Sequence, residues 1–156
     1  MNKISLQQLF IVFFIITSLN SCGFSLRGVY NISDKYKVIN LQGKMDDDFK
    51  KYLIRSFQDA NITIKTTDDA TILDIKNIIR KKNIQSLKTN GTVDKYYLSV
   101  GVTYRINGDT YKANATGILN FDENNIHANN SEQEIIYNEL NKKSIRIIMI
   151  KLQSMK

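Results

Sequence analysis

An unbroken apolar run at residues 9–16 dominates the beginning of the chain. It follows Lys3 and fades into a short stretch of threonine, serine and leucine. A stable transmembrane helix needs roughly 20 apolar residues, whereas the apolar region of a secretory signal peptide is shorter. The pattern therefore predicts that residues 1–21 are a signal peptide, which is cleaved after export. A buried N-terminal helix is disfavoured because nothing downstream is apolar enough to cover a helix that is apolar on every side.

A strand pattern and then a helix pattern come next. Residues 38–43 are β-prone and end at a glycine, which predicts a strand. Acidic residues at 46–48 suit the N-terminus of a helix, and Asn61 suits a left-handed C-terminal cap. Between them, apolar residues recur at helical spacing and predict one buried stripe: Phe49, Leu53, Phe57 and Ala60.

The middle of the chain has the pattern of β-strands. Residues 62–66 and 70–82 are rich in β-branched side chains, and residues 96–106 alternate strictly between apolar and polar. The turn 107–109 contains Asn-Gly, a strong hairpin signal, and residues 110–121 return with a second alternation. We expect an antiparallel hairpin with one buried face.

The alternation assigns each side chain of this hairpin to a face. In the first strand the apolar face consists of Leu98, Val100, Val102, Tyr104 and Ile106. Small residues in both strands are expected to leave room for a bulky element on the sheet: Gly101, Ala113, Ala115 and Gly117.

The final segment predicts a long helix that would occupy this room. Ser131 and Glu134 form a capping box, which places the start of a helix of roughly six turns after the polar loop 122–130. Four apolar residues fall within about 80° of the helix circumference and are expected to face the sheet: Ile136, Leu140, Ile147 and Ile150. Four more widen the stripe, towards the first helix or a partner: Ile145, Ile148, Met149 and Leu152.

These elements predict an α+β fold in which two helices pack on one face of a mostly antiparallel sheet of about four strands. Residues 22–156 are long enough for one domain with its own core. The sequence shows no internal repeat and no low-complexity linker that would divide them.

The one cysteine of the chain, Cys22, directly follows the apolar segment. Residues 19–22, Leu-Asn-Ser-Cys, resemble the bacterial lipobox, in which the cysteine is lipidated and the chain is cleaved just before it. A diacylglyceryl group and an N-linked acyl chain of the palmitate type would anchor the protein stably, because two or more chains are needed for that. Gly23 and Phe24 after the cysteine resemble an outer-membrane address. A free or buried thiol is the alternative.

Candidate catalytic chemistry is sparse. His127 is the one histidine and lies in an asparagine-rich segment, so neither a metal site nor a nucleophilic dyad can be assembled around it. The acidic runs 46–48 and 68–69 precede apolar segments and suit a helix start and a turn. We therefore predict no enzyme, no metal and no cofactor other than the lipid on Cys22.

Basic residues are in excess, with a net charge of +7. Such an excess attracts phosphorylated partners, and export of the chain argues against nucleic acid and for lipopolysaccharide, which carries phosphates. The residues concerned are Arg80, Lys81, Lys82, Lys88, Lys112, Lys142, Lys143 and Arg146.

Residues 22–28, Cys-Gly-Phe-Ser-Leu-Arg-Gly, resemble the segment that follows the lipidated cysteine in the LPS-assembly lipoprotein family LptE. The order of a strand, an amphipathic helix, a basic strand, a tyrosine-rich hairpin and a terminal helix is also similar to that family. The resemblance implies a non-enzymatic, lipid-anchored subunit of the outer-membrane lipopolysaccharide translocon in the Gram-negative cell envelope. Such a subunit plugs the β-barrel LptD in a 1:1 complex, assists its assembly, faces the periplasm and the barrel lumen, and binds lipopolysaccharide.

The resemblance also indicates where lipopolysaccharide would bind. Family members use basic residues before the long hairpin strand and before the final helix, and the nearest positions here are the uncharged Thr89 and Asn129. The candidates in this chain are Lys81, Lys82 and Lys88. Two other classes of function stay open: an outer-membrane lipoprotein that acts as a periplasmic binding or scaffold module without a barrel partner, and a lipid-anchored enzyme.

Overall fold

The computed structural model describes residues 30–67 and 69–155, so the predicted signal peptide and Cys22 lie outside the described residues. The elements follow one another along the chain as a short 3-10 helix η1 (Asp34–Tyr36), β1 (Val38–Gly43), α2 (Asp47–Asp59), β2 (Thr63–Ile64), β3 (Thr71–Leu87), β4 (Val93–Ile106), β5 (Asp109–Asn120) and α3 (Ile126–Ser154).

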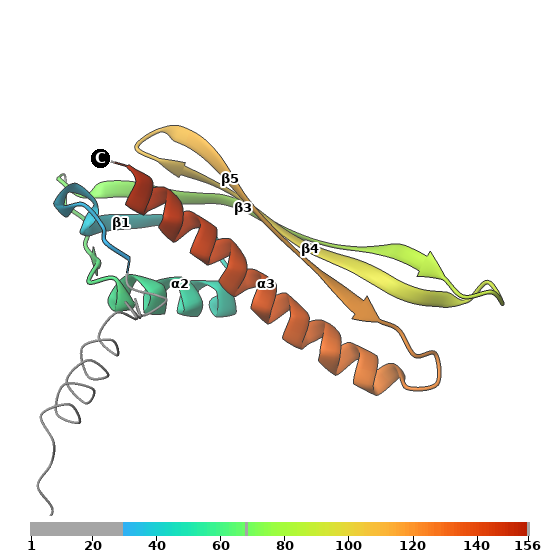
Figure 1. Cartoon of the computed structure of the whole chain (residues 1–156). Coiled ribbons are helices and arrows are strands. Elements are labelled where there is room, and N and C mark those ends of the chain that lie inside the picture. The colour runs from blue at the N-terminus through green and yellow to red at the C-terminus, as the bar shows by residue number, and fades with distance from the viewer. Residues whose placement is uncertain (1–29, 68, 156) are drawn as a thin grey trace, which may run out of the picture.

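The strands form a five-stranded sheet in the order β2-β1-β3-β4-β5. β1 pairs in parallel with both β2 and β3, whereas β3, β4 and β5 are antiparallel. Both α2 and α3 lie on one side of this sheet (Figure 1). The predicted α+β class is confirmed. The sheet is mixed because the chain passes through α2 between β1 and the next strands, and such a crossover allows parallel pairing.

The hairpin β4–β5 has the predicted faces. Twelve residue pairs join the two strands without a bulge, and Leu98, Val100 and Val102 are buried. Gly117 lies under α3, where an added Cβ would be 3.0 Å from Ile136 Cγ2. The prediction for Gly101 is wrong, because this residue points to the opposite, uncovered face of β4.

The last helix begins earlier than predicted. The Ala128 amide donates a hydrogen bond to Asn125 Oδ1 at 3.2 Å, so Asn125 is the N-cap and Ser131 lies inside the helix. The predicted polar loop is correspondingly shorter, and His127 lies in the first turn. With 29 residues, α3 is about 44 Å long and crosses the sheet diagonally (Figure 1).

The buried face of α3 also differs from the prediction. Ile147 is 37% exposed and Ile150 is 50% exposed. Of the four residues predicted to face the sheet, Leu140 is in the core. The other core residues on this helix are the four expected only to widen the apolar stripe: Ile145, Ile148, Met149 and Leu152. A count of apolar positions misses this face because two polar residues share it. Asn141 is 1% exposed and accepts a hydrogen bond from Arg80, and the fully buried Ser144 donates to the Val100 carbonyl.

The start of α2 is held by Asp46. Its Oδ1 accepts a hydrogen bond from the Phe49 amide at 2.9 Å, and its Oδ2 pairs with Arg80 on β3 at 2.8 Å. Partial burial acts to raise the pKa of Asp46, but these two partners outweigh burial, and the pKa lies below its usual value of 3.8. At the other end Asn61 has φ 56°, which confirms the predicted left-handed cap.

Asp46→Ala is expected to lower the free energy of unfolding by about 1 kcal/mol at neutral pH, because it removes an N-cap. The lowered pKa stabilises the folded state only while the carboxylate is ionised, so this contribution is lost as the pH falls through and below about 4. Urea unfolding at pH 7 and at pH 3 measures both effects. Asp48→Ala, which removes an acidic side chain in the first turn of α2 without removing the cap, is the control. An Asp46→Ala deficit that is the same at both pH values would contradict this role.

Candidate functional site

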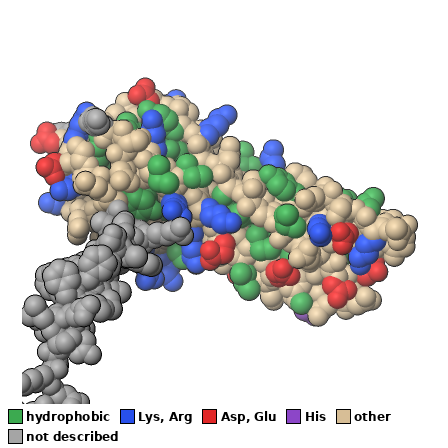
Figure 2. Space-filling model, in the orientation of Figure 1, with side chains coloured by type: hydrophobic (Ala, Val, Ile, Leu, Met, Phe, Trp, Pro, Cys, Tyr) green, Lys and Arg blue, Asp and Glu red, His purple; other side chains and the backbone are tan. Residues whose placement is uncertain are grey.

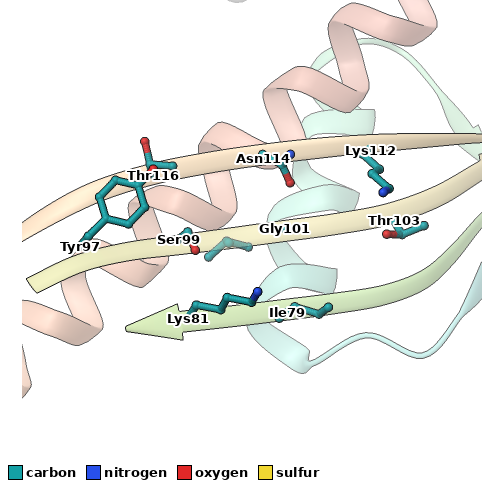
Figure 3. Close-up of a pocket in the computed structure, with 10 residues that line it drawn as sticks. Ile79, Lys81, Tyr97, Ser99, Gly101, Thr103, Lys112, Asn114 and Thr116 are labelled. Carbon is teal, nitrogen blue, oxygen red and sulfur yellow. The ribbon is translucent and has the colours of Figure 1, made fainter. Parts of the chain in front are cut away.

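The face of the sheet opposite α2 and α3 carries a trough formed by β3, β4 and β5 (Figure 3). Alternate residues of paired strands point to the same face, so residues that pair across the strands form rows. One row consists of Lys81, Ser99 and Thr116, and the next of Ile79, Gly101 and Asn114. The third consists of Asn77, Thr103 and Lys112.

The trough has a volume of about 400 Å³. Its depth at the centre depends on Gly101, which contributes no side chain to the floor. From β5, Asn114 leans over this position, and its Oδ1 lies 3.1 Å from where a Cβ on Gly101 would be. The lining residues are Ile79, Lys81, Tyr97, Ser99, Val100, Gly101, Thr103, Lys112, Asn114 and Thr116.

Two lysines flank the trough from opposite sides. Lys81 extends from β3 and Lys112 extends from β5, and both lie beside the floor strand β4 in Figure 3. No acidic residue lines the trough, and within residues 30–67 and 69–155 neither lysine forms an ion pair or a side-chain hydrogen bond. Another basic residue of β3, Lys76, pairs with Asp74 instead. The trough is therefore positively charged and offers two uncompensated ammonium groups.

The three lysines predicted as binding residues are not brought together. Only Lys81 lines the trough. Lys82 points to the helix side, where its Nζ donates to Gln133 Oε1 at 2.6 Å and lies 4.2 Å from the centroid of the Tyr96 ring. Lys88 belongs to the turn between β3 and β4, where its amide donates to the Thr92 carbonyl.

Thr89 and Asn129, the two uncharged positions indicated by the family resemblance, differ in burial. Thr89 is exposed at the end of the β3–β4 hairpin. Asn129 is only 5% exposed, and its amide closes the segment before α3: Nδ2 donates to the Asp122 carbonyl at 2.6 Å, while the Asp122 amide donates to Oδ1 at 3.1 Å. A residue with both of these bonds is committed to the fold, so Asn129 does not serve as a ligand contact.

The remaining basic residues do not form one patch. On the side that carries α2 and α3, basic and acidic side chains are interspersed (Figure 2). Arg80 is bound to Asp46 and Asn141, and Lys142 pairs with Glu139 at 2.7 Å, which raises the pKa of Lys142. Arg80 and Lys142 on this side thus have acidic partners, in contrast to the two lysines of the trough.

Groups that could act in catalysis or hold a metal are not assembled in the described part of the chain. His127 is exposed, and among the described residues no three His, Cys, Asp or Glu side chains lie together. The buried Tyr104 has its pKa raised to about 12 by burial and by neighbouring Tyr111, so it stays neutral. None of the helices described is long and apolar enough to cross a bilayer.

Sequence reasoning placed Lys112 among the basic residues but not in the site, and it overlooked Asn114 and Thr116. A signal for them exists. The Asn107-Gly108 turn fixes the register of β4 and β5, so counting back from it pairs Thr103 with Lys112 and Gly101 with Asn114.

Comparison with known proteins finds similarity to one family of sequences and to several solved structures. The sequence model of the LptE family, described as lipopolysaccharide-assembly, matches residues 27–152. No curated protein has a sequence that matches this chain.

Three solved structures share the fold. A minor lipoprotein from Acinetobacter baumannii has a TM-score of 0.66 at 15% identity, over 76% of this chain and 92% of its own. Rare lipoprotein B from Shewanella oneidensis has a TM-score of 0.68 at 17% identity, over 75% and 94%. An uncharacterized lipoprotein B from Nitrosomonas europaea has a TM-score of 0.64 at 22% identity, over 81% and 88%.

Proposed function

This chain belongs to the LptE family of lipopolysaccharide-assembly proteins, and on that premise we propose that it is the lipid-anchored plug of the outer-membrane lipopolysaccharide translocon. Family membership confirms the predicted class: a non-enzymatic lipoprotein of lipopolysaccharide assembly in the Gram-negative envelope. The observation that carries the proposal is the family match, which extends from residue 27 to residue 152 and so covers every described helix and strand except the last two residues of α3.

The proposed partner is one LptD β-barrel per chain. A plug must fit the lumen of a large bacterial barrel, which is polar. The uncovered face of this sheet supports the proposal because its central side chains are hydroxyl, amide and ammonium groups. A sheet with one helix-covered face and one polar face can keep its core intact while the polar face meets the lumen or lipopolysaccharide.

Anchoring is proposed to occur through Cys22. Cleavage before this cysteine would leave only residues 23–29 between the lipid and the first described residue, Tyr30. An extended chain spans at most about 3.6 Å per residue, so a connection of this length would hold the domain next to the periplasmic surface of the outer membrane.

Lipopolysaccharide is the proposed ligand of the basic β3 segment. Lys81 and Lys82 lie in the C-terminal half of β3, on opposite faces of the sheet, and Lys88 lies in the turn that follows. Their ammonium groups match the phosphates of lipopolysaccharide, and ion pairs with phosphate are among the stronger hydrogen-bonded contacts.

The experiment is an affinity purification of the full chain from detergent-solubilised membranes of its own cells. We expect co-recovery of one large β-barrel protein together with lipopolysaccharide. Cys22→Ser is the matched variant: it removes the lipid but leaves the fold, so it is expected to reduce the amount of chain in the membrane fraction severalfold. Recovery of the chain without any barrel would favour a periplasmic binding or scaffold module instead.

A further inference from the structure

We propose that the trough on the uncovered face of the sheet binds a short phosphorylated saccharide, with Lys81 and Lys112 holding phosphate and the floor of β4 meeting the sugar. The proposal deepens, and rests on, the proposed role in lipopolysaccharide assembly. It places the recognised part of the ligand, a sugar phosphate, on a surface that differs from the hairpin end and from the segment before α3. The same chemistry is present in a glycolipid headgroup and in a free sugar phosphate.

The charges of the trough favour an anion. Lys81 and Lys112 stand on the two strands that flank β4, so their backbones are separated by about 10 Å in the direction perpendicular to the strands. Along the strands they are separated by about 13 Å more, or four residues, because Lys81 pairs with Ser99 and Lys112 pairs with Thr103. The ammonium groups thus approach a ligand diagonally from two ends. Because none of the described residues that line the trough is a carboxylate, neither charge is compensated within it.

The floor between the lysines favours a polyol. Ser99 and Thr103 from β4 and Thr116 from β5 present hydroxyls, which both donate and accept hydrogen bonds. Asn114 adds an amide with two donors and one acceptor. Gly101 leaves space for a ring to approach the sheet at the centre. Alternating donors and acceptors at this density match sugar hydroxyls better than they match a phosphate alone.

Apolar contacts are available for the faces of a sugar ring. Tyr97 is 39% exposed and Ile79 is 45% exposed, and both line the trough. In Figure 3 the Tyr97 ring lies at the end of the trough that Ser99 and Thr116 share. A C–H-rich sugar face can pack on such side chains while its hydroxyls turn to the polar floor.

An acidic peptide fits less well. Extended peptides bind by main-chain hydrogen bonds to a free strand edge. The floor strand β4 is paired with β3 on one side and β5 on the other, so its main chain offers no such bonds. Recognition at the centre of the trough must therefore come from side chains, and these are the side chains of a saccharide site.

The test is calorimetric titration of the full chain in detergent with two soluble probes: glucosamine 1-phosphate and the phosphorylated oligosaccharide obtained by complete deacylation of lipopolysaccharide. We expect binding of at least one probe. Lys81→Glu and Lys112→Glu should each weaken binding about tenfold or more, because each removes a charge-assisted contact. Lys112→Arg should restore most of the loss. Lys143→Glu on α3 makes the same charge change outside the trough and should leave affinity within about twofold.

A second variant tests the space rather than the charge. Gly101→Leu would fill the floor, and the nearest neighbour that must move is only the Asn114 side chain. It should weaken saccharide binding about tenfold or more without altering the far-ultraviolet circular dichroism spectrum.

Several results would overturn the proposal: equal affinity for the dephosphorylated oligosaccharide, equal affinity for inorganic phosphate or an acidic peptide, or an equal loss with Lys143→Glu. Tighter binding of the oligosaccharide than of glucosamine 1-phosphate would assign the ligand to a glycolipid, and the reverse would assign it to a free sugar phosphate. If the barrel is recovered with the chain but neither saccharide binds, the saccharide site in the trough is refuted and the plug role stands. If saccharide binds in a lysine-dependent way but no barrel is recovered, the plug role is refuted and the saccharide site stands.

Discussion

Ile148→Asp is expected to unfold the domain or to leave it marginally stable. Ile148 is fully buried on the face of α3 that meets the rest of the core. An unpaired carboxylate at such a site costs several kcal/mol, and we expect a loss of about 4 kcal/mol or more from a total of about 5–15 kcal/mol. Urea unfolding followed by circular dichroism measures the loss.

The adjacent residue provides the control. Ile147 is 37% exposed, so Ile147→Asp leaves its carboxylate in water and should change the free energy of unfolding by less than about 1 kcal/mol. Equal losses for the two variants, or a larger loss for Ile147→Asp, would mean that α3 presents its other face to the sheet.

Gly43→Ala is expected to be the most damaging of the small substitutions. Gly43 ends β1 with φ +99°, and a Cβ there would overlap the Ile75 carbonyl oxygen and lie 2.8 Å from the Ile75 carbonyl carbon. These are backbone atoms of the paired strand β3, so they cannot move without breaking the parallel pairing of β1. We expect a loss of about 3 kcal/mol or more, from clash and strain together.

Gly91→Ala separates the clash from the strain. Gly91 also has a positive φ, +83°, but an added Cβ would meet nothing within 4 Å. Its expected loss is about 1 kcal/mol, the conformational cost alone. Thermal unfolding of both variants gives the comparison, and similar melting temperatures would contradict the close approach of β1 to β3.

The hairpin β4–β5 is predictable from sequence because every signal agrees there. Strict alternation from Leu98 to Ile106, and a turn at Asn107-Gly108 that fixes the register, leave one arrangement possible. The cap at Asp46 and the end of α2 at Asn61 follow for the same reason, since single residues there have one suitable conformation.

The orientation of α3 is not predictable from apolar spacing alone. Asn141 and Ser144 are buried because the Arg80 side chain and the Val100 carbonyl supply their hydrogen bonds, and these partners come from distant strands. Without them the apolar count selects Ile147 and Ile150, which the tertiary structure leaves exposed.

The trough is only half predictable. Lys112 and Asn114 follow from the register of the hairpin, but Lys81 does not. Register shifts between Ile75 and Asn77 and between Ile84 and Ser86 interrupt the pairing of β3 with β4, so the face on which Lys81 or Lys82 lies cannot be counted along the sequence. Two adjacent lysines that look equivalent in the sequence therefore lie on opposite sides of the sheet.

The stoichiometry of the membrane complex that purifies with this chain decides whether the chain works as the plug of a lipopolysaccharide translocon. We expect one copy of a single large β-barrel protein for each copy of this chain, in a complex that is stable to high salt because a plug is held by an extensive surface. Purification of the chain alone, or with substoichiometric and varied proteins, would refute this role.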